Sequence, residues 1–214
     1  MKFLFVAITL LTIVFTTKAQ TRIELETIED IVKNEQEYFN DIVEIYKSDD
    51  PYLRTDDIAL VYYGEAFKPV SKDSKNNLLK KYYSENNIKE LYNTATEILK
   101  NRPASLSALF YAWVAAKESG KSEEEALSYV NKFNKIVTMI IESGSGKNSE
   151  SPFCITHPDD QQFIMAALDI SNSISSKFDT ESLCYIHIIK PTEKFQSSVL
   201  YFDLTLFLKK KSME

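Results

Sequence analysis

The chain has 214 residues, of which 44% are hydrophobic and 26% are charged, and its formal net charge is −6, as expected of a globular protein. It contains only four glycines, against 13 phenylalanines and 12 tyrosines. This composition argues against nucleotide-binding folds, which need glycine where the backbone meets phosphate, and against β-sandwiches with glycine turns. The acidic charge argues against a general affinity for nucleic acid. We therefore expect a mainly helical protein with no nucleic-acid partner.

Residues 1–19 have the pattern of a secretory signal peptide. A basic Lys2 precedes an uncharged, mostly apolar run at residues 3–15, and Ala19 follows as a small residue suited to cleavage. The run is shorter than the ~20 residues that a membrane span needs, although an uncleaved anchor is the alternative interpretation. We expect the mature chain to be exported and soluble, with no transmembrane segment.

Residues 20–143 are predicted to form a body of helical hairpins. Apolar residues recur every three or four positions, which is typical of helices with one buried face. Gly120 is suited to ending one helix at positive φ, and Ser122 with Glu125 forms a capping box that starts the next. The short breaks predict antiparallel packing, and residues 103–133 resemble a tetratricopeptide unit. The predicted helices span about residues 28–46, 58–66, 78–83, 88–99, 106–116 and 122–140.

Residues 144–214 are predicted to form a small α+β cap packed on the body, so the fold class is mainly α with a C-terminal α+β part. Residues 144–152 are polar and rich in glycine and serine, which predicts a flexible connector. The apolar alternation of the last two segments predicts an antiparallel β-hairpin with one buried face. The predicted elements are strands at 153–156, 183–189 and 199–206 and a helix at 159–173.

The two cysteines, Cys154 and Cys184, both lie in the C-terminal part. In an exported protein such a pair can form a disulfide. The alternative is a pair of buried thiols that act as small hydrophobic side chains. The sequence leaves both open, because it does not supply the Cα separation that decides between them.

The segment His157-Pro158-Asp159-Asp160 resembles the signature of zinc-dependent amide deacetylases. The resemblance implies that His157 and Asp160 bind the metal, and His187 is the remaining histidine that could complete the set. Gln161 departs from the signature, which has an acidic residue there. The simpler interpretation is a helix start, with a polar cap, proline in the first turn and acids at the positive end of the dipole. We prefer it, and we expect no metal, no cofactor and no catalytic residue.

Aromatic residues are the other candidates for a binding surface, because tyrosine offers a flat apolar face and a polar tip. Adjacent tyrosines on one helix are not expected to face the core together, so one of each pair should be partly exposed. The alternative is that the rings simply fill the helical core. The residues concerned are Tyr62, Tyr63, Tyr82, Tyr83, Tyr92, Tyr111 and Trp113.

The order of short motifs along the chain resembles that of an uncharacterised family of secreted proteins from Gram-negative bacteria, the domain of unknown function 4919. The motifs are Val61–Gly64, Ser119-Gly120, Ser143–Gly146, Pro152-Phe153 and Leu200–Asp203. The resemblance implies export to the periplasm or the exterior and a helical fold with terminal strands, and it implies no reaction.

Within that family the Tyr-Tyr-Gly element is the best-marked position, so Tyr62, Tyr63 and Gly64 are candidate binding residues, together with Trp113. The leading hypothesis is an exported, non-enzymatic protein whose helical-hairpin surface binds a protein, a peptide or a glycan. The alternative is a zinc-dependent hydrolase or deacetylase that uses His157, Asp160 and His187.

Overall fold

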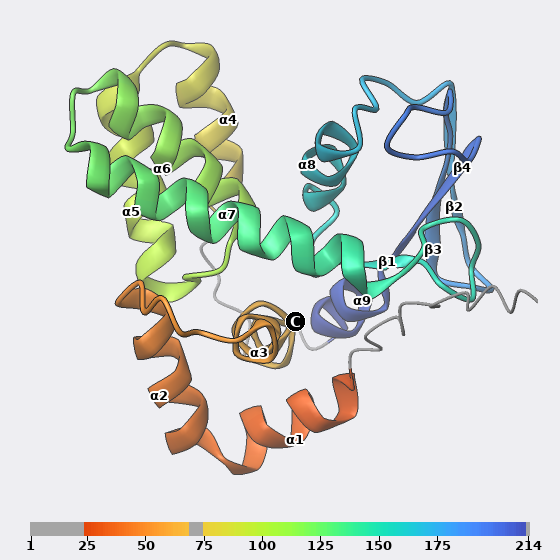
Figure 1. Ribbon diagram of the computed structural model, residues 1–214, viewed down its shortest axis with the longest axis horizontal. Helices are drawn as coiled ribbons and strands as arrows, with labels where there is room; N and C mark the ends of the chain where they lie inside the picture. Colours follow the sequence, from red (N-terminus) through yellow and green to blue (C-terminus); the bar gives the residue numbers. More distant parts are fainter. Residues whose placement is uncertain (1–23, 69–74, 213–214) are drawn as a thin grey trace, which may run out of the picture.

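The computed structural model describes residues 24–68 and 75–212, so the predicted signal peptide lies outside the described residues. Figure 1 shows a helical part followed by a small sheet at the C-terminal end. The predicted fold class, mainly α with a C-terminal α+β part, is confirmed. Within the described ranges the helices are α1 (Leu25–Asn34), α2 (Gln36–Lys47), α3 (Thr55–Gly64), the 3₁₀ helix η1 (Glu65–Phe67), α4 (Asn76–Ser84), α5 (Ile88–Asn101), α6 (Leu106–Glu118), α7 (Glu123–Ser143), α8 (Asp160–Ala167) and α9 (Thr205–Lys211).

The helices α5, α6 and α7 form the hairpin stack of the body, and α6 packs on both of its neighbours. Their ends are fixed by the local chemistry that the sequence predicts. Gly120 has φ +69° after α6, and the Ser122 hydroxyl accepts a hydrogen bond from the Glu125 backbone N–H at 3.1 Å. The end of α6 and the beginning of α7 were therefore predictable from Gly120 and Ser122 alone.

The apolar stripe at residues 28–46 predicts one helix, but the chain forms two, α1 and α2, which meet at Glu35 with φ −121° and ψ 49°. Both helices pack against α3. A straight helix of this length would run past α3, whereas the bend lets both halves bury their apolar faces on it. The stripe continues across the break because both halves face the same neighbour.

Helix α3 lies near the centre of the helical part, with α1 and α2 on one side and α7 on the other (Figure 1). Every residue from Asp57 to Gly64 is buried. The expectation that one of Tyr62 and Tyr63 is exposed is therefore wrong, since neighbouring elements surround α3. The same expectation is right for the other pair, because Tyr83 on α4 is 49% exposed.

The sheet has the strand order β1-β4-β3-β2. Its central pair, β3 and β4, is antiparallel as the sequence predicts, and β1 joins β4 in parallel. Strand β2 and helix α9 were not predicted from the sequence. The last strand was predicted over residues 199–206, but it ends at Asp203, and α9 begins at Thr205. The four strands are β1 (Phe153–Cys154), β2 (Ser175–Asp179), β3 (Cys184–Ile188) and β4 (Val199–Asp203).

Cys154 and Cys184 are free thiols, so of the two alternatives that the sequence left open the disulfide is wrong. Both residues are paired in register with Asp203, Cys154 from β1 and Cys184 from β3. Strand β4 therefore lies between them, and two inter-strand spacings separate their Cα atoms by about 9.5 Å. A disulfide needs a separation below about 7 Å. Burial raises the pKa of both thiols, which keeps them protonated.

The segment between α7 and β1 is not the flexible connector that its composition predicts, because it is hydrogen-bonded to the sheet. The Tyr201 backbone N–H donates to the Gly146 carbonyl at 2.8 Å, and the Gly146 N–H donates to the Ser151 carbonyl at 2.8 Å. Gly146 has φ +66°, and a Cβ there would lie 2.5 Å from Phe153 Cε2. Glycine thus serves close packing here. One apolar core runs from Ile28 to Leu206 and includes residues of both parts.

Candidate functional site

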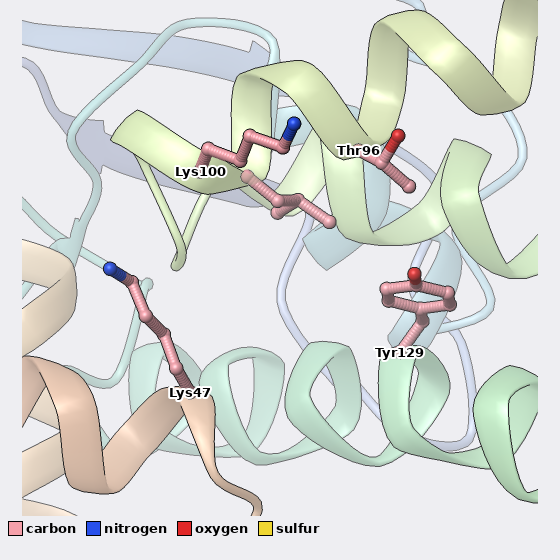
Figure 2. A pocket seen from close by; sticks show the side chains of 5 residues that line it. Lys47, Thr96, Lys100 and Tyr129 are labelled. Atoms are coloured by element: carbon pink, nitrogen blue, oxygen red, sulfur yellow. The ribbon is translucent and has the colours of Figure 1, made fainter.

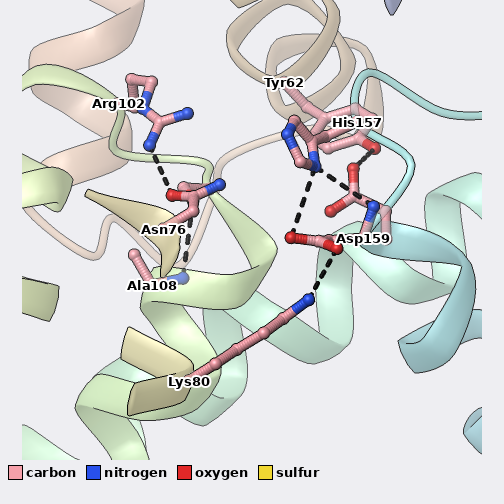
Figure 3. A network of polar contacts seen from close by, with 9 residues as sticks. Tyr62, Asn76, Lys80, Arg102, Ala108, His157 and Asp159 are labelled. Carbon is pink, nitrogen blue, oxygen red and sulfur yellow. Dashed lines mark hydrogen bonds and ion pairs between the residues drawn. The ribbon is translucent and has the colours of Figure 1, made fainter. Parts of the chain in front are cut away.

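The Tyr-Tyr-Gly element and the His-Pro-Asp-Asp segment contact each other in the structure. The Tyr62 hydroxyl donates a hydrogen bond to Asp160 Oδ2 at 2.7 Å and accepts one from the Thr156 backbone N–H at 3.1 Å. The Tyr63 hydroxyl donates to the Cys154 carbonyl at 3.1 Å. We call these residues the motif junction; Figure 3 shows its surroundings. They join α3 to β1 and to the start of α8.

Burial dominates the electrostatics of the motif junction. Asp160 is only 4% exposed, and burial raises its pKa to about 7, although the hydrogen bond from Tyr62 acts in the opposite direction. Burial also holds the pKa of the Tyr62 hydroxyl well above its ordinary value. A neutral tyrosine thus faces a carboxyl group that changes protonation near neutral pH.

His157 supplies two acceptors to the start of α8. Its Nδ1 accepts from the Asp159 backbone N–H at 3.1 Å, and its carbonyl accepts from the Asp160 N–H at 3.0 Å. The Asp159 carboxylate is paired with Lys80 Nζ on α4 at 2.8 Å (Figure 3). Burial lowers the pKa of His157, so the ring is neutral at pH 7 and accepts through Nδ1. This arrangement fits the helix-start interpretation of the segment.

The structure does not bring the three candidate zinc ligands together. His187 lies on β3, where its Nε2 donates to Gln161 Oε1 at 2.6 Å, while Asp160 and His157 have the partners described above. In the described part of the chain, no group of three or more histidine, cysteine, aspartate or glutamate side chains could hold a metal ion. Gln161, the departure from the deacetylase signature, is itself the partner of His187.

The four candidate binding residues do not form one surface. Tyr62 and Tyr63 are buried, and a Cβ on Gly64 would lie 2.6 Å from Phe39 Cε2. Gly64 thus allows α2 to approach α3 closely. Trp113 is partly exposed on α6, where Lys117 Nζ lies 5.5 Å from its ring centroid. The first three residues therefore belong to the core.

An accessible cavity of about 290 Å³ lies on the helical body between α5 and α7, next to the C-terminal end of α2. We call it the α5–α7 groove (Figure 2). None of its lining residues was predicted from the sequence to bind a ligand. The only local signal is on α5, where three of them are spaced i, i+3 and i+4 and so share a helix face. The lining residues are Lys47, Thr96, Leu99, Lys100 and Tyr129.

Side chains of both α5 and α7 contact the Tyr129 hydroxyl of the groove. The Tyr92 hydroxyl on α5 donates to Glu125 on α7, and Tyr129 interacts with both residues. Burial raises the pKa of Tyr129, so its hydroxyl stays protonated. Lys47 Nζ is paired with Glu44 at 2.8 Å. The contacts among Tyr92, Glu125 and Tyr129 connect α5 to α7 and hold the Tyr129 hydroxyl.

A second cavity of about 390 Å³ lies between α1, α2 and the end of η1. Its two lysines are already paired, Lys33 with Glu29 at 2.6 Å and Lys68 with Glu65 at 2.9 Å. By contrast, Lys100 in the α5–α7 groove has no ion-pair partner among the described residues. The α5–α7 groove is therefore the better candidate for binding a charged ligand.

The fold and the groove define a helical-hairpin protein with a small C-terminal sheet and a cavity on its helical surface. Its sequence matches the family model described as domain of unknown function (DUF4919) over residues 26–213. The chain belongs to this family. No curated protein and no solved structure matches it. Within residues 24–68 and 75–212, no helix is both long and apolar enough to cross a membrane.

Proposed function

We propose that this chain is an exported, non-enzymatic binding protein that holds a protein, peptide or glycan partner in the α5–α7 groove. The observation that carries the proposal is an accessible cavity lined by an aromatic ring, an apolar side chain and two amines on packed helices. Such a mixture of apolar area and a few polar groups is typical of ligand sites. The apolar leader at residues 3–15 supports export.

The burial of the motif junction supports placing the binding site elsewhere. A partner needs accessible atoms, whereas Tyr62 and Tyr63 are 2% and 0% exposed. The hydroxyls of both tyrosines are hydrogen-bonded inside the protein. No observation favours the zinc-dependent hydrolase, because its candidate ligands have other partners.

The test is a binding screen of the mature chain, starting at Gln20, against a display library of peptides with free C-termini and an array of glycans. Thr96→Trp fills the groove, and Lys89→Ala on the exposed side of α5 is the matched control. We expect ligands of the unmodified protein to bind Thr96→Trp about tenfold more weakly or worse and to bind Lys89→Ala unchanged. Failure to recover a ligand, or equal binding to Thr96→Trp, contradicts the proposal.

Export is tested separately by fractionating the bacterium that makes the protein and sequencing its N-terminus. We expect the periplasmic or external fraction to contain a chain that begins at Gln20. A chain that keeps residues 1–19 and stays with the membrane or the cytoplasm refutes this part of the proposal.

A further inference from the structure

We infer that the α5–α7 groove takes the C-terminus of a peptide, with the carboxylate between Lys47 and Lys100 and an apolar last side chain against Leu99 and Tyr129. The inference rests on the proposed function and names the ligand class of the same site. The charge of the rim, the apolar floor and the size of the cavity support it.

The rim carries positive charge in a chain whose net charge is −6. Lys47 comes from the end of α2 and Lys100 from α5, so the two lysines line the cavity from different helices (Figure 2). Lys100 forms no ion pair within the described ranges. The partner of Lys47 is Glu44, whose side chain is 71% exposed, and an exposed pair of this kind contributes little to stability. A ligand carboxylate can therefore displace Glu44 at little cost.

The floor of the groove favours an apolar side chain and a peptide backbone. Leu99 and the Tyr129 ring are partly buried and supply apolar area. The Thr96 hydroxyl donates to the Tyr92 carbonyl at 2.9 Å, so it offers a ligand only acceptor lone pairs. A peptide N–H is the donor that matches such an acceptor.

The size of the cavity and the polar groups that line it favour a peptide C-terminus over an acidic glycan. A cavity of about 290 Å³ is at the lower limit of ligand pockets, so it holds one or two residues. The lining contains no amide or carboxylate side chain, and these are the groups that pair with the several hydroxyls of a sugar. Two amines above an apolar floor match a carboxylate next to an apolar side chain.

The experiment uses the hexapeptide Gly-Ser-Gly-Ser-Gly-Leu, whose N-terminal amine is acylated by a fluorophore, with either a free carboxylate or a C-terminal amide. Binding is measured by fluorescence anisotropy. We expect the amide to bind about tenfold more weakly than the free acid, and the affinity of the free acid to fall with added salt, because exposed charges are screened. Lys47→Ala and Lys100→Ala should each weaken the free acid severalfold, and Lys89→Ala should leave it unchanged.

The outcomes separate this inference from the proposed function. Equal binding of acid and amide, no binding of either, or insensitivity to both lysine variants overturns the inference. Binding of oligogalacturonate that depends on both lysines also overturns it, in favour of an acidic glycan. If library ligands are lost in Thr96→Trp but still bind after amidation, the proposed function stands and the inference fails. Circular dichroism of each variant checks that the fold is retained.

Discussion

The buried carboxyl group of Asp160 makes the stability of the fold depend on pH. Its pKa is about 7 in the folded chain, against an ordinary value of 3.8, so the folded state binds this proton more tightly than the unfolded state. The contribution of Asp160 to the free energy of unfolding is complete below 3.8, its pKa in the unfolded chain. It is lost as the pH rises through about 7, its pKa in the folded chain. The free energy of unfolding should fall by about 1.4 kcal/mol per pH unit between these values.

The variant that isolates this effect is Asp160→Asn, which stays neutral and keeps an oxygen that accepts from Tyr62. Between pH 5 and pH 8 the unmodified protein should lose roughly 2 to 3 kcal/mol relative to the variant. Burial lowers the pKa of His157 and of His187, and both give slopes of the opposite sign at lower pH. Comparison with the variant cancels their contribution as long as its histidines titrate unchanged.

The assay is urea unfolding at pH 5, 6, 7 and 8, followed by circular dichroism and by the fluorescence of Trp113, the single tryptophan. The difference in free energy between the two proteins is plotted against pH. Any fixed cost of the asparagine shifts this difference equally at every pH, so the slope carries the result. A difference that is constant, or that favours the unmodified protein increasingly toward pH 8, refutes the reasoning.

Three further predictions concern packing, the thiols and metal. Gly64→Ala should lower the free energy of unfolding by about 1 to 3 kcal/mol, because its Cβ meets the Phe39 ring; an unchanged urea midpoint would contradict this packing. Titration with a thiol reagent under denaturing, non-reducing conditions should find both Cys154 and Cys184 reactive, and finding neither would restore the disulfide. The melting temperature of the mature chain should not change with a chelator, and bound zinc in the purified protein would revive the hydrolase hypothesis.

Helices with one buried face were predictable, because their apolar period is local information. Strand β2 was not, since the segment Ser175–Asp179 is polar and mostly exposed. It pairs with β3 through its backbone, and its side chains add no apolar alternation. Helix α9 was also missed. Leu204 and Leu206 continue the apolar pattern of β4, whereas a single hydrogen bond from the Thr205 N–H to Asp203 Oδ1 at 2.7 Å marks the turn.

The candidate site was less predictable than the fold because tertiary packing assembles it. The lining of the α5–α7 groove combines Lys47, Tyr129 and a short face of α5, and no local pattern connects these segments. The environment of α3 is likewise decided by its neighbours. Its sequence places Tyr62 and Tyr63 side by side, and only the packing of neighbouring elements around α3, among them β1 and the start of α8, buries both rings.

Three successive residues of α3 hold three different parts of the protein. Tyr62 binds the start of α8, Tyr63 binds β1, and Gly64 admits the Phe39 ring of α2. These contacts account for the whole Tyr-Tyr-Gly element without any ligand, so the motif specifies the scaffold. In the groove, Leu99 and Tyr129 pack partly against the core, whereas Lys47 and Lys100 are exposed and make no such contacts with the core. A chain with the same motif and other residues in place of these two lysines should therefore keep this fold and bind a different ligand.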